Sequence, residues 1–198
     1  IRLSDDGKDA KNWRPNPMVL AGSPTRRWYL IEFANSFTQN QGILTVVSFL
    51  SDENVQEKRI QSLKQNIREY MAKRGVEGLV KVYPSKNRFE GAVNLISAYG
   101  LGALEPNTII LGETNQEDNT SEFCSMVERF YEMKRNVLII HHGEGEQAFG
   151  AKAKIDVWWG GLKGNGGLMM ILSYLLKQSI DWRQASICIK MVVEDVQG

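Results

Sequence analysis

Residues 43–50, Ile-Leu-Thr-Val-Val-Ser-Phe-Leu, decide the fold class of this chain. The run is almost entirely apolar and rich in β-branched residues, which predicts a strand buried on both faces of a sheet. Four more such runs lie at residues 18–21, 79–83, 108–111 and 137–140, and the segments between them carry apolar residues at helical spacing. Five buried strands alternating with four helices predict a doubly wound α/β domain with a mainly parallel sheet.

The ends of the predicted helices are marked by capping residues. Ser23 and Pro24 are expected to begin the first helix, at residues 25–39, and Gly42 to close it. Ser51 or Asp52 is expected to cap the second helix, which Gly75 ends. Helices at residues 89–99 and 121–135 complete the set. Right-handed crossovers then give the strand order 3-2-1-4-5, with a crevice where strands 1 and 4 separate.

A second α/β unit is predicted after Gly150. It consists of a strand at residues 154–159, a glycine-rich loop, an apolar helix at 168–177 and a strand at 185–193. One βαβ unit is too small to fold alone, so it either extends the first sheet or begins a second domain, and the second reading is preferred. We therefore expect three parts: a linker at residues 1–17, an α/β subdomain at 18–150, and an incomplete subdomain at 151–198 that continues past Gly198.

Composition excludes several classes of function. The 198 residues carry a net charge of +1, so no basic excess is available for nucleic acid. The longest apolar stretch, residues 166–176, is about half of what a bilayer requires. Cys124 and Cys188 lie in apolar patterns and are expected to be reduced core thiols of a cytosolic protein.

No catalytic motif is present. The chain contains no G-x-S-x-G elbow, no phosphate-binding G-x-x-x-x-G-K-[ST] loop, and no G-x-G-x-x-G after the first strand. His141 and His142, with Glu144 and Glu146, do not predict a metal site, because adjacent strand residues point to opposite faces. We therefore predict a protein that is not an enzyme and needs no metal or cofactor.

The crevice is the place where a ligand would bind, at the carboxyl ends of the strands. Arg26 and Arg27 lie in the first turn of the following helix, where a positive charge hints at an anion. However, Glu113, Glu117 and Asp118 would repel a triphosphate, so ATP is expected to bind weakly or not at all. The candidate nucleotide-binding residues are Ala21, Gly22, Ser23, Ser48, Gly112, Glu113 and Thr114.

Three stretches resemble a known family. They are Lys-Asn-Trp-Arg-Pro-Asn-Pro-Met-Val-Leu-Ala-Gly-Ser-Pro at residues 11–24, Gly-Leu-Gly-Ala-Leu-Glu-Pro-Asn-Thr-Ile-Ile-Leu-Gly-Glu at 100–113, and Ile-Asp-Val-Trp-Trp at 155–159 with the apolar helix at 166–176. Their order and spacing resemble the C-terminal cytoplasmic domain of cation–chloride cotransporters, over residues 11–182. The chain departs from the family pattern at Gly164 and Asn165, where acidic residues are expected.

The resemblance implies a fold like that of universal stress proteins, a transmembrane transport domain upstream of Ile1, and a homodimer on the cytoplasmic side of the membrane. It implies a regulatory and dimerising role in the transport of chloride with sodium or potassium. The alternative is a free-standing nucleotide-binding protein of the universal stress type. About twelve apolar segments upstream of Ile1, each of about 20 residues, would separate the two.

Two further expectations concern contacts. A helix that is apolar all round is buried on every side or lies at an interface. The helix predicted at residues 168–177 is of this kind, and its candidate interface residues are Leu168, Met169, Leu172, Leu175 and Leu176. Trp13 is expected to anchor the linker on the domain, because it buries a large apolar area at low entropic cost.

Overall fold

The computed structural model describes residues 13–39, 41–51, 55–114, 119–141, 149–160 and 164–192. The chain divides into two compact units, unit 1 at Ile1–His142 and unit 2 at Gly143–Gly198.

The sheet of unit 1 has five parallel strands in the order β3-β2-β1-β4-β5. This arrangement confirms the predicted fold class and strand order. The sequence reveals it because the strands at the centre of such a sheet are buried on both faces: all four residues of β1 and all five of β4 are buried. The strands are β1 (Pro17–Leu20), β2 (Thr45–Leu50), β3 (Leu79–Pro84), β4 (Thr108–Gly112) and β5 (Asn136–Ile140).

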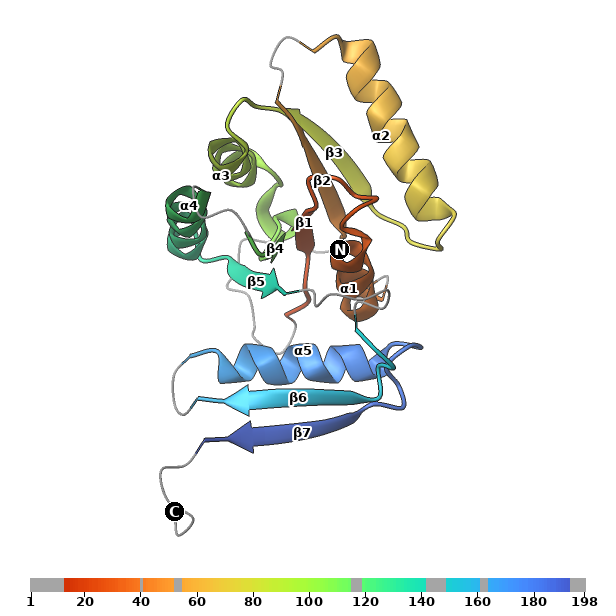
Figure 1. The fold of residues 1–198 in the computed structure, drawn as a ribbon, viewed down its shortest axis with the longest axis vertical. Helices are drawn as coiled ribbons and strands as arrows, with labels where there is room; N and C mark the ends of the chain where they lie inside the picture. The colour runs from red at the N-terminus through yellow and green to blue at the C-terminus, as the bar shows by residue number, and fades with distance from the viewer. Residues whose placement is uncertain are drawn as a thin grey trace. The chain divides into compact units, whose positions relative to one another are not determined.

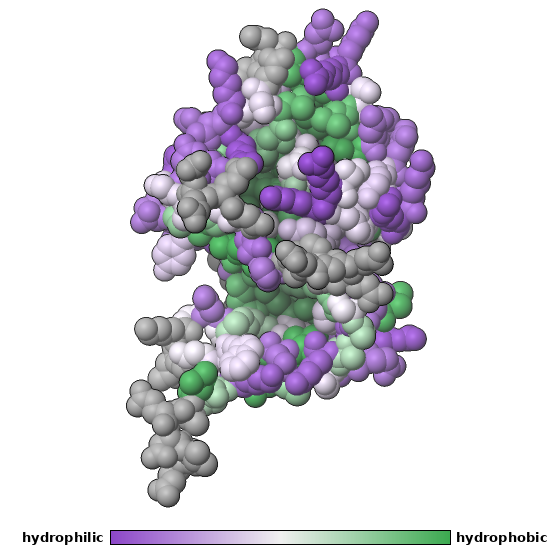
Figure 2. Space-filling model, viewed as in Figure 1, coloured by the Kyte–Doolittle hydropathy of each residue, from purple (hydrophilic) through white to green (hydrophobic). Residues whose placement is uncertain are grey.

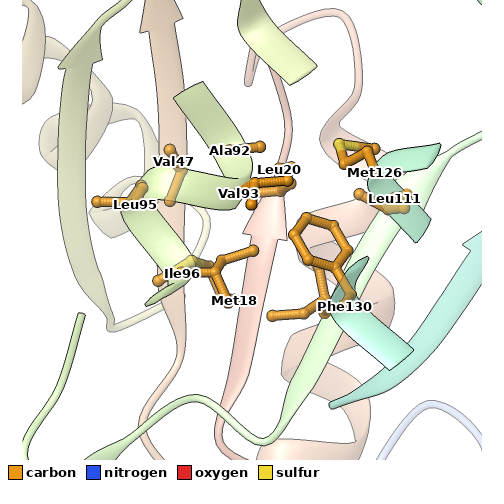
Figure 3. Packing of buried hydrophobic residues seen from close by; sticks show 11 residues of the cluster. Met18, Leu20, Val47, Ala92, Val93, Leu95, Ile96, Leu111, Met126 and Phe130 are labelled. Atoms are coloured by element: carbon orange, nitrogen blue, oxygen red, sulfur yellow. The ribbon is translucent and has the colours of Figure 1, made fainter. Parts of the chain in front are cut away.

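Helices cover both faces of this sheet (Figure 1). They are α1 (Trp28–Thr38), α2 (Glu57–Ala72), α3 (Arg88–Ala98) and α4 (Thr120–Glu132), with a short 3-10 turn, η2 (Gly102–Leu104), before β4. Met18 and Leu20 of β1 pack against Ile96 of α3 and Phe130 of α4 in one buried cluster, shown from close by in Figure 3. Alternate residues of β1, such as Val19, face the other layer and are equally buried.

The predicted start of the first helix is wrong. Ser23 and Pro24 lie in a turn that precedes α1, and the N-cap is Arg27, which makes no side-chain capping bond. The Ser23 carbonyl accepts hydrogen bonds from the backbone N–H groups of Arg26 and Arg27, and its Oγ lies 3.3 Å from Thr25 Oγ1. The Ser23 hydroxyl therefore bonds within the turn rather than at a helix end.

Other helix ends also differ from the prediction. The C-cap of α1 is Gln39, which is left-handed with φ 44°, rather than Gly42. α2 begins after Gln56, and Asp52 lies outside the described residues. Gly75 does adopt a positive φ of 69°, as a helix-ending glycine does, but it follows the C-cap Lys73 of α2 by two residues. The cap with side-chain bonds is Asn87, whose Oδ1 accepts from the N–H groups of Phe89 and Glu90.

Two asparagines join the chain segment that leads into β1 to the amino ends of two other strands, β2 and β4. The Asn107 side chain accepts from Asn16 N at 2.9 Å and donates to Arg14 O at 2.7 Å. Asn16 Oδ1 accepts from Ile43 N at 3.0 Å, just before β2. Both asparagines come from the stretches that carry the family resemblance, so those stretches have a structural role at this end of the sheet.

Unit 2 is a parallel pair of strands with one helix, as predicted: β6 (Lys154–Trp159), α5 (Gly166–Gln178) and β7 (Ser186–Met191). The Trp159 ring packs so closely on Gly166 that a Cβ atom there would lie 2.2 Å from it. On the opposite face, Lys190 Nζ donates to Asp156 at 2.7 Å. This hydrogen bond holds the pKa of Asp156 below its usual value.

The candidate interface residues of α5 differ in exposure. Leu172 and Leu176 are buried, whereas the remaining three, Leu168, Met169 and Leu175, are half-buried. The exposed apolar side chains of α5 are instead Ile171 and Tyr174. Neither cysteine is a fully buried core thiol: Cys124 is exposed on α4 and Cys188 is half-buried, and both are free.

Candidate functional site

A pocket of about 550 Å³ lies at the carboxyl ends of β1 and β4, on the face of the sheet that α3 and α4 cover. Its position is where a doubly wound sheet binds ligands, because the two central strands lead their chains away in opposite directions there. Six of the seven candidate residues line it: Ala21, Gly22, Ser23, Gly112, Glu113 and Thr114.

Ser48, the seventh candidate, does not line this pocket. It is buried and donates its hydroxyl hydrogen to Gly22 O at 2.6 Å, which fixes the loop after β1. It lines a second hollow of about 360 Å³ beneath α2, with Leu63, Ile67 and Tyr70. The loop at Gly22 and Ser23 borders both spaces.

Two glycines shape the pocket wall differently. Gly22 has φ +64°, a conformation that favours glycine, and no atom lies within 4 Å of the position of a Cβ atom. At Gly112 a Cβ atom would lie 2.8 Å from the Tyr29 hydroxyl and 3.3 Å from a guanidinium nitrogen of Arg27. The Arg27 side chain therefore lies against the end of β4, within the pocket wall.

Cations predominate among the described residues of this pocket. Arg26, Arg27 and Arg88 line it, and Glu113 is its one described carboxylate. Sequence reasoning singled out the first two arginines but missed Arg88, the first residue of α3. Finding it requires knowing that the amino end of α3 opens onto the pocket, which Ser85 and Phe89 also line.

The Glu113 carboxylate is paired. Its Oε2 lies 2.6 Å from His141 Nδ1, and the imidazole is largely exposed. The strand register places Gly112 beside Ile140, so the next residues of the two strands meet. The pairing was therefore available from the topology. His142, Glu144 and Glu146 lie outside the described residues, as do Glu117 and Asp118.

The chemistry of this pocket favours binding. Hydroxyl groups of Ser23, Ser51, Ser85 and Thr114 and three guanidinium groups surround it, a set suited to oxyanions. Across the described residues, no group of three or more His, Cys, Asp or Glu side chains is arranged as metal ligands would be.

Comparison with known proteins gives the family. Residues 27–151 match the model of "Solute carrier family 12", more than half of the chain. The chain belongs to solute carrier family 12. This membership confirms the resemblance to cation–chloride cotransporters that the sequence stretches showed.

Two relatives of this family 12 chain are named as cation–chloride cotransporters. It is 25% identical over 211 residues to "Potassium/chloride cotransporter 3" of Caenorhabditis elegans. The aligned region covers 98% of this chain and 19% of that protein. The chain thus spans about a fifth of the length of that curated relative. The solved "cytoplasmic domain of a prokaryotic cation chloride cotransporter" shares its fold, with a TM-score of 0.72 at 17% identity, covering 93% of the chain and 69% of the solved one. Among the described residues, no helix is long and apolar enough to cross a bilayer.

Proposed function

We propose that this chain is the cytoplasmic regulatory and dimerisation domain of a cation–chloride cotransporter. The family match over residues 27–151 carries the proposal. A membrane domain of the same protein would transport chloride with potassium, sodium or both, and this domain would adjust its rate. The hydrogen bonds from Asn107 to the segment before β1 support the proposal, because they offer a rigid path from that segment into the sheet.

The test is ion flux in the full-length protein. Chloride-dependent uptake of potassium and of sodium is measured with Asn107→Ala and with the control Asn94→Ala, whose side chain is exposed on α3. We expect Asn107→Ala to change the maximal rate while the ion requirement stays the same. A maximal rate unchanged by Asn107→Ala would contradict the regulatory role. A full-length protein with no chloride-dependent flux would contradict the transport assignment.

We propose that unit 2 mediates the dimer. Tyr174 is 61% exposed on α5, and Ile189 and Met191 are 57% and 62% exposed on β7. The strand register puts both β7 residues on the face of the strand pair that also carries Val157 and Trp159. Exposed apolar side chains gathered in so small a unit are typical of an interface.

Tyr174→Glu is expected to shift the chain from dimer to monomer, because a carboxylate in an apolar interface is desolvated without a partner. Sedimentation equilibrium measures the change. Tyr131→Glu is the matched control, since Tyr131 is 79% exposed on α4 of unit 1 and should leave the dimer intact. A wild-type chain that remains monomeric at high concentration would refute dimerisation through this chain.

We propose that the pocket at β1 and β4 holds a phosphate-bearing ligand such as a nucleotide. Three arginines favour it. Glu113, one of the three carboxylates on which the expectation of weak ATP binding depends, has its Oε2 2.6 Å from His141 Nδ1. Free-standing stress-type proteins would use the same crevice, but the family match favours a transporter domain.

Glu113→Gln is expected to tighten ATP binding roughly tenfold by removing one like charge from the pocket, about 1.4 kcal/mol. Arg27→Gln is expected to weaken it by a similar factor. Titration calorimetry with ATP and ADP, with and without magnesium, measures both. Equal affinities for wild type and both variants would place any nucleotide elsewhere.

A further inference from the structure

The outer face of α2 concentrates positive charge. Residues 57–73 hold five basic residues and two acidic ones, a net +3, while the whole chain carries +1. The rest of the chain is therefore net −2, and α2 stands out against it. The five basic residues are Lys58, Arg59, Lys64 and Arg68 of α2, and Lys73, its C-cap.

None of these five cations is neutralised by a carboxylate among the residues that the structure describes. The ion pairs there lie on other elements: Arg135 with Glu105, His141 with Glu113, and three within unit 2. The two acidic residues of α2 are held by glutamines of the same helix. Gln61 donates to Glu57 at 2.6 Å and Gln65 donates to Glu69 at 2.8 Å. The cations are thus available to an external partner.

The helix presents these cations on a convex surface. Only Ile67 and Met71 of α2 are buried, and four of the five cations are exposed, Lys64 being half-buried. α2 lies at the outer margin of unit 1, over β3 (Figure 1), and hydrophilic residues line that side of the molecule (Figure 2). Sixteen residues of helix extend about 24 Å, so the charges are distributed along an extended surface rather than gathered around a pocket.

We propose that this outer face of α2 binds the anionic phospholipid headgroups of the membrane in which the transporter sits. A convex, cation-rich helix surface can lie against an extended plane of phosphates, and anionic leaflets attract clusters of lysine and arginine. Family 12 membership tethers the domain to a membrane protein, so such a plane lies within reach. The inference rests on that membership and not on the regulatory role.

The binding is electrostatic rather than insertive. Of the large apolar side chains of α2, Ile67 and Met71 are buried in unit 1, and none of the others (Ile60, Leu63 and Tyr70, all half-buried) is fully exposed. Binding should therefore require anionic lipid and disappear at high salt, because screening shortens the reach of surface charges to about 3 Å at 1 M salt.

Co-sedimentation of the 198-residue chain with vesicles tests the proposal. Vesicles of phosphatidylcholine with about 30% phosphatidylserine, which supplies the negative surface potential of an anionic leaflet, are compared with pure phosphatidylcholine at low and high salt. The wild-type chain is expected to bind the anionic vesicles at low salt alone.

Charge-neutralising variants locate the surface. The triple variant Lys58→Gln, Arg68→Gln, Lys73→Gln is expected to lower the partition coefficient on the order of a hundredfold. The matched control, Lys81→Gln, Arg129→Gln, Lys134→Gln, removes the same charge from exposed positions outside α2 and should lower it much less. Circular dichroism melting confirms that both variants are folded.

Three outcomes would overturn the proposal. The wild-type chain could fail to bind anionic vesicles. The two triple variants could lose binding equally, which would mean that net charge alone matters. A polyglutamate peptide could bind α2 while vesicles do not, which would assign the face to an acidic protein segment.

Discussion

Gly42→Ala is expected to destabilise unit 1 by about 3 kcal/mol, because the new methyl group has no space. A Cβ atom at this position would lie 2.0 Å from Pro15 O and 3.2 Å from both Pro15 C and Thr38 Cγ2. The nearest obstacle is backbone, which cannot rotate away as the end of a side chain can. Relief therefore requires that the segment before β1 moves off the sheet or that the loop before β2 shifts.

Urea unfolding followed by circular dichroism measures this effect. Gly160→Ala is the control, since its Cβ position has no atom within 4 Å and its φ is not in the left-handed region. We expect Gly42→Ala alone to lower the midpoint. Equal midpoints for the two variants would show that residues 13–16 do not lie against Gly42 in solution.

The sequence reveals the core of unit 1 because burial on both faces leaves a continuous apolar run. The apolar runs of β2 and β4 can be recognised without knowing which strands lie beside them. Such runs, taken in chain order with right-handed crossovers, predict the strand order of the sheet. Helix ends follow weaker rules. Ser23 and Asn87 are both good capping residues, but only Asn87 caps, because the Ser23 hydroxyl already bonds within its own turn.

The candidate pocket was predictable to the extent that topology determines it. Once the strand order is known, Ala21 and Gly112 must lie side by side at the end of the sheet. Side-chain direction is a further step. Ser48 turns toward the Gly22 carbonyl and the α2 layer, while Arg88 reaches the pocket from a helix whose placement no local pattern reveals.

The family stretches gain a physical explanation only from the structure. In the sequence, Asn16 and Asn107 are two polar residues that precede apolar strands. In the fold they precede adjacent parallel strands, β1 and β4, and the Asn107 backbone N–H also donates to Asn16 O at 3.2 Å. Asn16 and Asn107, 91 positions apart in the chain, thus form one contact between the starts of β1 and β4. Local sequence patterns cannot identify such a contact.

Asn107→Ala is expected to destabilise unit 1 by about 2–3 kcal/mol. Three side-chain hydrogen bonds are lost: those with Asn16 N, Arg14 O and the Thr108 hydroxyl. Each contributes about 1 kcal/mol, and a partner left buried without a substitute costs more. This penalty should be largest for the Thr108 hydroxyl, because Thr108 is completely buried and no water can replace the lost partner.

The loss of structure in Asn107→Ala should begin in the segment before β1 and leave the sheet intact, since β1 keeps its backbone pairing with β2 and β4. We therefore expect the amide of Asn16 to exchange its hydrogen much faster in Asn107→Ala, and chymotrypsin to cleave sooner after Trp13, which is half-buried in the wild type. Amide exchange by NMR and timed proteolysis measure the two. Asn94→Ala on α3 should alter neither. If Asn107→Ala lowers stability while the Asn16 amide stays protected, the asparagine supports the sheet without holding the segment before β1. The path from that segment into the domain would then run through the contact of Pro15 with Gly42 and the hydrogen bond between Asn16 and Ile43.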